Sequence, residues 1–443
     1  WLGLVRDYLV DPGLFITMDL CQSRGLIPPR RSWISPLEPV CVAVFWNGAG
    51  PSATDSAGHP TDMQSNWDVI VIGAGVAGGL AAFDCANRGL RVLVVEKRSF
   101  PRWKVCGCCF NANSLASLSA TGLPNLMHDQ GAVPLDQLRL GWGGNSLKLE
   151  LPGGLALSRE RFDQALVNAA EGAGATLRFR TSAVLEEMTP EGRMVRLRPP
   201  SGAPVERISG RVVLVAAGLE HQVIAPSHAA SSKSTPESRL GAGCLIADDD
   251  GTYEPGTIHM AIGQHGYVGL VRREDGALNL AAAFDRAVVK SSGGVARAAQ
   301  LVLTQAGFAL PRALESSRWQ LTPALTRRAG AFAGHRFLLL GDATGYVEPF
   351  TGEGMAWALA AGASVAPFVE EAQGEWTLDL ERRWRRRLVD LTISRQRVCS
   401  VLSTVLRQPL ITNALFSLGS QWPVVPQRVI SSLNRVHPHM ARS

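Results

Sequence analysis

The 443-residue sequence has no long apolar run and only a few, scattered cysteines. No stretch approaches the roughly 18–20 apolar residues that a membrane-spanning helix requires. The eight cysteines are irregularly spaced, which disfavours a disulfide framework and favours reduced thiols in a cytoplasmic protein. Hydrophobic residues make up 46% of the chain and charged residues 19%. Because these fractions are those of ordinary globular enzymes, a disordered chain is excluded, and the length predicts two domains.

Metal-binding and hydrolase patterns are also missing. Cys106, Cys108 and Cys109 form a cluster, but no second cysteine pair or suitably spaced histidines accompany it, so no metal site is predicted. The Gly-x-Ser-x-Gly pattern of serine hydrolases does not occur. The chemistry of this chain therefore has to come from another source.

Residues 377–443 contain no lysine and few acids. Eleven arginines stand against three acidic residues, a net charge of +8 that exceeds the +6 of the whole chain. Such a region is either a solvated helix face or a peripheral contact with an anionic membrane. No nucleic-acid motif accompanies the charge, so nucleic acid is not expected as a partner.

What is present indicates an α/β fold. Short apolar runs at 69–72, 92–95, 212–216 and 337–340 are typical of strands buried on both faces of a parallel sheet. Helical patterns cover 77–88 and 161–171, and this alternation predicts a Rossmann-type domain built from separate pieces of chain. Residues 257–284 and 135–157 alternate and carry glycine turns, which predicts a second, antiparallel sheet. From Trp376 the pattern is helical, with expected breaks at Pro409, Pro423 and Pro426.

These patterns divide the chain into four parts. Residues 1–62 show no sustained period and are expected to be a poorly ordered extension without a role in function. The discontinuous nucleotide-binding domain is assigned to 63–117, 155–225 and 326–375. The substrate domain is assigned to 118–154 and 226–325, with a linker at 226–238, and a helical C-terminal region to 376–443.

A glycine loop follows the first strand and has the spacing Gly73-x-Gly75-x-x-Gly78. Gly73 permits a tight turn, Gly75 lets backbone approach a pyrophosphate, and Gly78 lets helix and strand pack closely. Glu96 ends the next strand, where an acid takes the adenosine ribose hydroxyls. Lys97 beside it is a further expected cofactor contact, although Glu96 would repel a 2′-phosphate, so NADP is disfavoured in this loop.

A second loop distinguishes between dinucleotides. Asp342 in Gly341-Asp342 ends an apolar run, and its carboxylate can accept hydrogen bonds from a ribityl hydroxyl. Gly352 and Gly354 open a helix whose N–H groups can face the pyrimidine edge of a flavin, where the reduced form carries negative charge. Two such loops in one chain predict FAD.

With these motifs, the sequence resembles the flavoprotein superfamily of p-hydroxybenzoate hydroxylase-type monooxygenases, geranylgeranyl reductases and flavin-dependent halogenases. A third motif supports this: residues 159–163 are similar to the superfamily's Arg-x-x-(Leu/Phe)-Asp element, and the resemblance implies that Arg159 lies along FAD. Residues 101–107 are most similar to the geranylgeranyl reductase-like branch, in which Pro-Arg-x-Lys-x-Cys-Gly passes near the flavin. The resemblance makes Cys106 the candidate catalytic residue, as a proton donor or redox partner, with packing as the alternative.

Departures from the superfamily leave several activities open. The Trp-x-Trp-x-Ile-Pro motif of halogenases is absent, and the prenyl reductases' Tyr-x-Trp-Phe-Pro is reduced to Gly266-Tyr267. Ala217-Gly218 stands where hydroxylases carry Asp-Gly. The first hypothesis is an FAD-dependent monooxygenase reduced by NAD(P)H and acting on an apolar aromatic, polyketide-like or isoprenoid small molecule. The alternatives are a geranylgeranyl reductase-like enzyme that saturates C=C bonds and an electron-transfer flavoprotein at a membrane.

Overall fold

The computed structural model describes residues 67–189, 191–200, 203–219, 223–224, 232–247, 251–348, 350 and 352–436. The chain divides into two units, Trp1–Thr61 and Asp62–Ser443, and all described residues belong to the second. The predicted extension at 1–62 lies outside the described residues.

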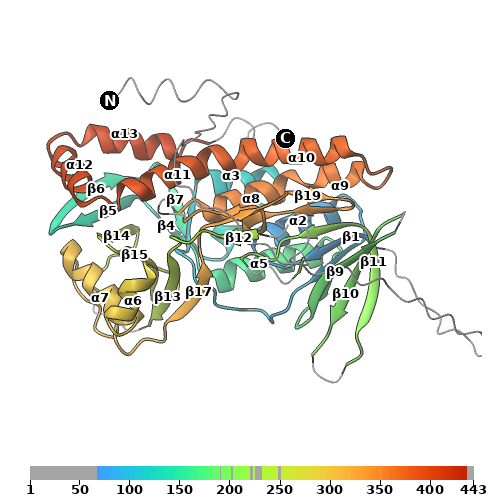
Figure 1. Ribbon diagram of the computed structural model, residues 1–443, viewed down its shortest axis with the longest axis horizontal. Coiled ribbons are helices and arrows are strands. Elements are labelled where there is room, and N and C mark those ends of the chain that lie inside the picture. The colour runs from blue at the N-terminus through green and yellow to red at the C-terminus, as the bar shows by residue number, and fades with distance from the viewer. Residues whose placement is uncertain are drawn as a thin grey trace, which may run out of the picture. The chain divides into compact units, whose positions relative to one another are not determined.

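An eight-stranded sheet forms the centre of the nucleotide-binding part (Figure 1). Its main path is β19 (Ala333–Gly334), β20 (Phe337–Leu339), β11 (Glu206–Val215), β1 (Trp67–Ile72), β2 (Val92–Val95) and β8 (Thr176–Arg178). The pairs from β20 to β8 are parallel. β9 (Ser182–Met188) and β10 (Arg193–Arg198) extend β11 as antiparallel strands, a pair that the sequence did not predict.

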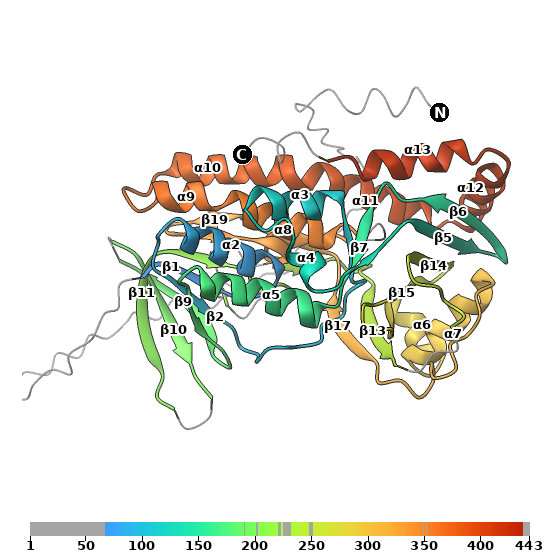
Figure 2. The same cartoon turned by 180° about the vertical axis from the view of Figure 1, so that it is seen from behind.

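The two faces of this sheet are both buried, which explains the unbroken apolar runs. Val69 and Val71 of β1 pack into a core with the helices, whereas Ile70 and Ile72 pack on the opposite face beside β9 and β10. The helical layer, seen from the other side in Figure 2, consists of α2 (Val76–Asn87), α3 (Ala112–Ala120), α5 (Arg159–Gly172), α8 (Gly354–Ser364), α9 (Ala366–Glu371) and the short α4 (Leu126–Asp129).

The second large sheet has seven strands. Its order is β17 (Gln320–Ala324), β13 (Leu240–Ile246), β16 (Leu278–Phe284), β15 (Gly266–Arg272), β14 (Thr257–Gly263), β5 (Gln137–Trp142) and β6 (Asn145–Glu150). It is antiparallel except where β14 meets β5. One face packs on α6 (Arg286–Ser291) and α7 (Val295–Ala306), which the sequence did not predict. The α/β fold with a second, largely antiparallel sheet and a helical C-terminus is thus confirmed.

Two small sheets correct the finer predictions. β7 (Gly154–Ala156) was expected in the second sheet, but it pairs with β3 (Cys109–Asn111) and β4 (Val133–Pro134), because Gly153 turns the chain away after β6. Part of the expected linker is a strand: β12 (Ser232–Ser234) pairs with β18 (Arg327–Ala329), which also pairs with β21 (Gly345–Tyr346). Residues 226–231 of that linker lie outside the described residues.

The predicted domain boundaries remain a prediction. Leu118 and Met127, which were assigned to the substrate domain, pack into the same core as β1 and α2. The 226–325 segment includes β13 to β16, which form the second sheet.

The C-terminal region is helical, as expected. It contains α10 (Leu378–Leu388), a π-helical turn (Val389–Ile393), α11 (Ser394–Val405), α12 (Pro409–Gln421) and α13 (Val424–Leu433). Pro409 is the first residue of α12 and Pro423 caps α13, but Pro426 lies inside the first turn of α13 and breaks nothing, because a proline there removes no intrahelical hydrogen bond. No helix in the described part of the chain is long and apolar enough to cross a membrane.

Candidate active site

The first glycine loop forms a tight junction between β1, β11 and α2. Gly73 has a φ of +102°, and a Cβ there would lie 2.5 Å from the carbonyl oxygen of Ala216. A Cβ at Gly78 would lie 1.9 Å from the carbonyl oxygen of Gly73. At Gly75, by contrast, the nearest described atom is a nitrogen of Arg102 at 3.8 Å. The outer two glycines are therefore needed for packing, and the middle one leaves the start of α2 open.

Glu96 is buried at the end of β2 and is held by backbone on both sides. One carboxylate oxygen accepts a hydrogen bond from the amide of Ala74 at 3.0 Å, and the other accepts one from Arg98 at 3.0 Å. The carboxylate is thereby fixed beside the glycine loop. Lys97 next to it is exposed and does not line the cavity described below.

Arg159 begins α5 because the hydroxyl of Ser158 caps the helix, accepting from the amide of Arg161. The guanidinium of Arg159 donates to both carboxylate oxygens of Asp163, at 2.8 and 2.7 Å, and Asp163 is fully buried. Arg102 lies 3.4 Å from the same carboxylate and 3.8 Å from that of Glu96. Two positive charges are therefore held beside the open end of α2 by buried acids.

The second loop starts at Gly341, which has a φ of +56° and directly follows the β20 strand end. Burial raises the pKa of the Asp342 carboxyl, and Lys104 and Arg159 oppose this rise. Burial likewise lowers the pKa of Lys104, which the neighbouring Arg159 reinforces and Asp342 opposes. Asp342 and Lys104 thus each favour the charged form of the other.

Gly352 has a φ of +73°, and a Cβ there would meet no described atom within 4 Å. Gly354 is the first residue of α8. Between them, the buried Glu353 forms an ion pair with Arg395 of α11 at 2.8 Å. Sequence reasoning assigned no role to this ion pair, because its two members are 42 positions apart.

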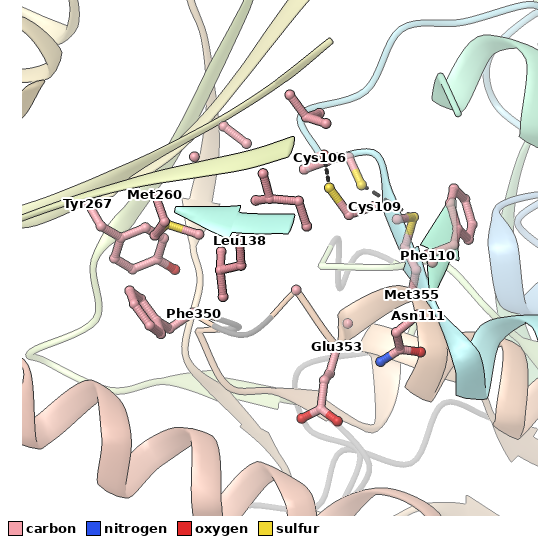
Figure 3. Close-up of a pocket in the computed structure, with 18 of the residues that line it drawn as sticks. Cys106, Cys109, Phe110, Asn111, Leu138, Met260, Tyr267, Phe350, Glu353 and Met355 are labelled. Atoms are coloured by element: carbon pink, nitrogen blue, oxygen red, sulfur yellow. Dashed lines mark hydrogen bonds between the residues drawn. The ribbon is translucent and has the colours of Figure 1, made fainter. Parts of the chain in front are cut away.

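Cys106 lies near the start of α8, among sulfur and polar groups (Figure 3). Its sulfur lies 3.4 Å from the sulfur of Met355 and accepts a hydrogen bond from the amide of Cys108 at 3.5 Å. Interaction with the Cys108 thiol, and the positive charge of Arg159, lower the pKa of Cys106 although burial opposes this. Burial raises the pKa of the neighbouring Cys109. In the described residues no cluster of His, Cys, Asp or Glu could hold a metal ion.

One cavity of about 830 Å³ joins most of these groups. The predicted site residues that line it are Gly75, Cys106, Arg159, Gly341, Asp342, Gly352 and Gly354. Gly73, Gly78, Glu96 and Lys97 lie outside its lining. Lys104 and Glu353 also contribute to the wall.

The other end of the cavity is aliphatic and aromatic. Leu138, Met260 and Tyr267 come from the second sheet, and Phe350 lies against Tyr267 with the ring centroids 5.2 Å apart (Figure 3). Residues of α11, α12 and α13 complete the wall, which the sequence did not predict: Leu402, Leu406, Leu415, Phe416, Leu418, Trp422, Val425 and Val429. Their spacing of three and four positions indicates an apolar helix face but does not show what it covers.

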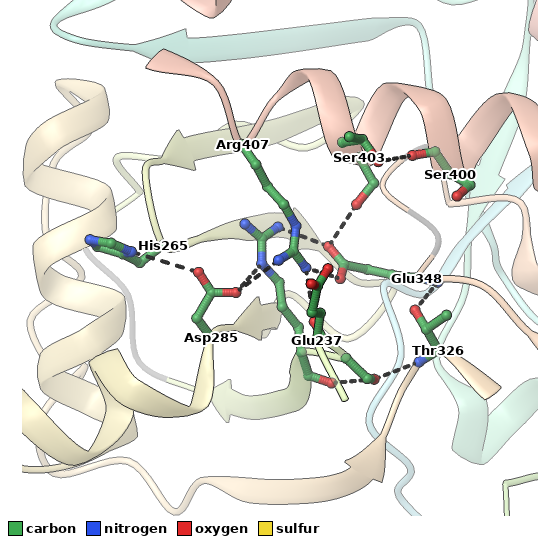
Figure 4. Close-up of polar contacts among 11 residues, drawn as sticks. Glu237, His265, Asp285, Thr326, Glu348, Ser400, Ser403 and Arg407 are labelled. Carbon is green, nitrogen blue, oxygen red and sulfur yellow. Dashed lines mark hydrogen bonds and ion pairs between the residues drawn. The ribbon is translucent and has the colours of Figure 1, made fainter. Parts of the chain in front are cut away.

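A buried ionic network holds α11 against the second sheet (Figure 4). Arg239, which precedes β13, pairs with Asp285 at 3.0 Å and with Glu348 at 2.9 Å. Arg407 lies 3.5 Å from Asp285, and Ser403 donates to Glu348 at 3.4 Å. Because Glu348 lies in the loop between Asp342 and Gly352, the network also positions that loop.

The arginine-rich helix α10 lies away from this cavity and is packed on the nucleotide-binding sheet. Trp384 is fully buried, and its indole nitrogen donates to the carbonyl of Leu339 at 3.3 Å. Arg383 pairs with Asp379 and Glu371. Trp384 is therefore unavailable as an interfacial anchor.

The fold and the cavity are those expected of a flavoprotein, and comparison with known proteins agrees. Residues 66–366 match the family model described as an FAD binding domain, and the chain belongs to this family. It is 26% identical over 355 residues to a menaquinone reductase from Mycobacterium tuberculosis, covering 74% of this chain and 81% of that protein.

Two further similarities are to a lipid reductase and a monooxygenase. The chain is 30% identical over 158 residues to digeranylgeranylglycerophospholipid reductase 2 from Methanopyrus kandleri, covering 35% of this chain and 39% of that protein. Among solved structures, p-nitrophenol 4-monooxygenase from Pseudomonas putida superposes with a TM-score of 0.68 at 18% identity, covering 84% of this chain and 100% of the other. This last likeness concerns the fold. The protein is thus an FAD-dependent oxidoreductase of the superfamily that unites monooxygenases, reductases and halogenases.

Proposed function

We propose that this oxidoreductase saturates a carbon–carbon double bond in a long, apolar, isoprenoid-type substrate. The observation that carries the proposal is the cavity of about 830 Å³, whose lining includes Cys106, residues of both cofactor loops and an aliphatic wall. A wall of leucine, isoleucine and valine suits a flexible hydrocarbon chain and offers few polar groups to orient a small polar aromatic. The similarity to a menaquinone reductase and to a lipid reductase also supports ranking alkene reduction ahead of monooxygenation.

The described residues fit FAD. The open space at Gly75 leaves the start of α2 accessible from the cavity, and the N–H groups of a helix start bind a pyrophosphate well. Glu96 would accept from the adenosine ribose and Asp342 from the ribityl chain. Gly352 and Gly354 would present N–H groups to the flavin, and Arg159 would lie along it.

In this proposal the protein supplies the proton that the alkene needs. FAD held by these residues would supply a hydride equivalent in its reduced state. One alkene carbon takes that hydride, and the other takes a proton from the sulfur of Cys106. The interaction with Cys108 and the charge of Arg159 stabilise the thiolate that remains, which then regains a proton from water. The apolar wall excludes bulk water from the reacting carbons.

The electron donor is proposed to be NAD(P)H. A nicotinamide would supply the electron pair that FAD needs, and Lys104, which lines the cavity, and Arg102, which lies beside Glu96, would offer positive charge for its phosphates. Anaerobic bleaching of the flavin by NADH or NADPH would support this, and no bleaching by either would contradict it.

Monooxygenation is the second candidate, because the fold is shared with a monooxygenase and apolar side chains line most of the cavity. The two reactions differ in their need for oxygen. Reduction of an alkene proceeds without oxygen, whereas hydroxylation stops in its absence.

The test uses the purified, FAD-loaded protein with a chemical reductant and a long-chain isoprenoid alkene, with and without oxygen. We expect saturated product under both conditions. Cys106→Ser should slow its formation at least about 100-fold, as expected for loss of a general acid, without loss of bound flavin. The matched control is Cys109→Ser, because Cys109 lies three positions after Cys106 and also lines the cavity, and this variant should change the rate little. Equal rates for both variants would contradict the role of Cys106.

A further inference from the structure

Helices α12 and α13 carry apolar side chains on their outer surface. Of the seventeen large apolar side chains that are exposed among the described residues, eleven lie between positions 398 and 436. On α12, Ile411, Leu415 and Leu418 recur at spacings of four and three and continue to Trp422, so they form one stripe. The adjacent stripe, which includes Phe416 and Gly419, is buried against β6. The outward stripe is thus additional to the one that holds the helix on the protein.

This stripe is continuous with the cavity. Leu415 and Leu418 of α12, Trp422 directly after it, and Val425 and Val429 of α13 line the cavity and yet are at least 45% exposed. A residue can do both only at an opening. The aliphatic end of the cavity therefore opens between α12 and α13, which lie beside β5 and β6 (Figure 1). These five residues, Ile411 and its exposed neighbour Leu410 in the first turn of α12 are called the α12–α13 surface.

The charged residues of the helices that form this surface have one sign, although the exposed Glu150 of β6 lies beside Gln427 of α13. No acidic residue follows Asp390 in the sequence. Arg397, Arg428 and Arg435 are exposed on or next to α11 and α13. An apolar stripe on helices that themselves carry only positive charge is the composition of a helix that lies in the interface of an anionic bilayer.

We infer that the α12–α13 surface docks on an anionic membrane and that a chain-bearing substrate passes from the bilayer into the cavity between the two helices. The passage of substrate rests on the proposed function, whereas the docking does not. This assigns membrane contact to α12 and α13 rather than to the arginine-rich α10, whose Trp384 is buried.

Flotation of the full-length protein with vesicles tests the docking. The vesicles contain either phosphatidylcholine alone or a mixture with phosphatidylglycerol, at low and at high salt. We expect flotation with the anionic vesicles, reduced but not abolished by high salt, because both apolar burial and charge contribute. A protein that stays at the bottom with anionic vesicles at low salt would overturn the inference.

Leu410→Asp tests the apolar contribution, with Leu378→Asp as its matched control. Leu410 is 84% exposed in the first turn of α12, and Leu378 is 69% exposed at the start of α10; neither lines the cavity. An acid in the first turn of a helix is favourable, so both variants should fold. Leu410→Asp should weaken vesicle binding about tenfold or more, the loss expected for one buried leucine, and Leu378→Asp should leave it unchanged. Equal losses would place the contact elsewhere and overturn the inference.

Arg428→Glu tests the charge, and it should weaken binding to anionic vesicles about fivefold or more while leaving binding to neutral vesicles unchanged. Light scattering supplies a further check, since a dimer that Leu410→Asp converts to a monomer would show that a second copy covers this surface instead. The outcomes separate the two proposals. Alkene reduction in detergent without flotation contradicts only the docking, and flotation without alkene reduction contradicts only the proposed function.

Discussion

At the cofactor end of the cavity, backbone atoms and buried charges determine the geometry, whereas at the aliphatic end side chains of several elements surround an open space. A Cβ at Gly73 or Gly78 would overlap backbone, and Asp163 is fully buried between two arginines. The opposite wall contains residues such as Trp422 that are 66% exposed. The comparison indicates that the first end tolerates almost no change, and that the second determines which substrate is accepted.

Asp163→Asn should cause the largest loss. An amide cannot neutralise Arg159, so a buried positive charge loses its counterion, at a cost of about 3–5 kcal/mol in the free energy of unfolding. Urea denaturation of the FAD-loaded protein measures it. Asp379→Asn is the control, because Asp379 pairs with Arg383 at the surface and should change stability little. Similar losses of unfolding free energy in the two variants would contradict the claim that buried ion pairs stabilise the cofactor end.

Gly78→Ala should cost about 2–3 kcal/mol, since the new methyl group would lie 1.9 Å from the carbonyl oxygen of Gly73 and the backbone must move. Gly75→Ala sharpens the comparison, because its methyl group meets only the end of the Arg102 side chain at 3.8 Å. This variant should be about as stable as the parent without cofactor but bind FAD at least about tenfold more weakly. Thermal unfolding and flavin titration separate the two effects. If neither variant bound FAD more weakly than the parent, the proposed binding of the FAD pyrophosphate at this glycine loop would be contradicted.

Leu138→Trp changes the aliphatic end. Leu138 lines the cavity, and the larger tryptophan side chain there should lower kcat/KM for a long-chain alkene about tenfold. FAD content and stability should stay near those of the parent. Leu321→Trp is the control, since Leu321 is exposed on β17 and does not line the cavity. Loss of FAD from Leu138→Trp would contradict the separation of the two ends.

The pH dependence of the chemical step tests the proton donor itself. The pKa of Cys106 is lowered to about 6 by interaction with the Cys108 thiol and by Arg159. Because the thiol is the proton donor, the rate should be highest below pH 6 and fall as the pH rises through about 6, by about tenfold per further pH unit. Rapid-mixing kinetics at several pH values would measure this, and Cys106→Ser should lack the fall. A rate that rises with pH would contradict a thiol acid.

The cofactor end could be predicted from the sequence because its constraints are local. Gly73, Gly75 and Gly78 lie in one contiguous turn, so their spacing indicated their arrangement, whereas the place of Arg159 was implied by the resemblance to a motif of the superfamily. The sequence-based assignment of these residues to FAD remains a prediction that the variants above test.

The aliphatic end could not be predicted in the same way. The pairing of Glu353 with Arg395 depends on how α11 packs, and periodicity cannot specify a partner for a helix face. The same reason explains why the basic helix α10 suggested a membrane contact although its Trp384 is buried. The place of β7 was misassigned because a three-residue strand carries too little pattern to indicate its sheet.

The central claim is that one cavity brings a reduced flavin and an alkene chain together at Cys106. The most direct measurement is the anaerobic reoxidation of the reduced, FAD-loaded protein by a long-chain isoprenoid alkene, followed by flavin absorbance and product mass. The account predicts that the absorbance of oxidised flavin returns and that the product gains a pair of hydrogen atoms and no oxygen. A flavin that stays reduced until oxygen is admitted, with a product that then gains an oxygen atom, would contradict it.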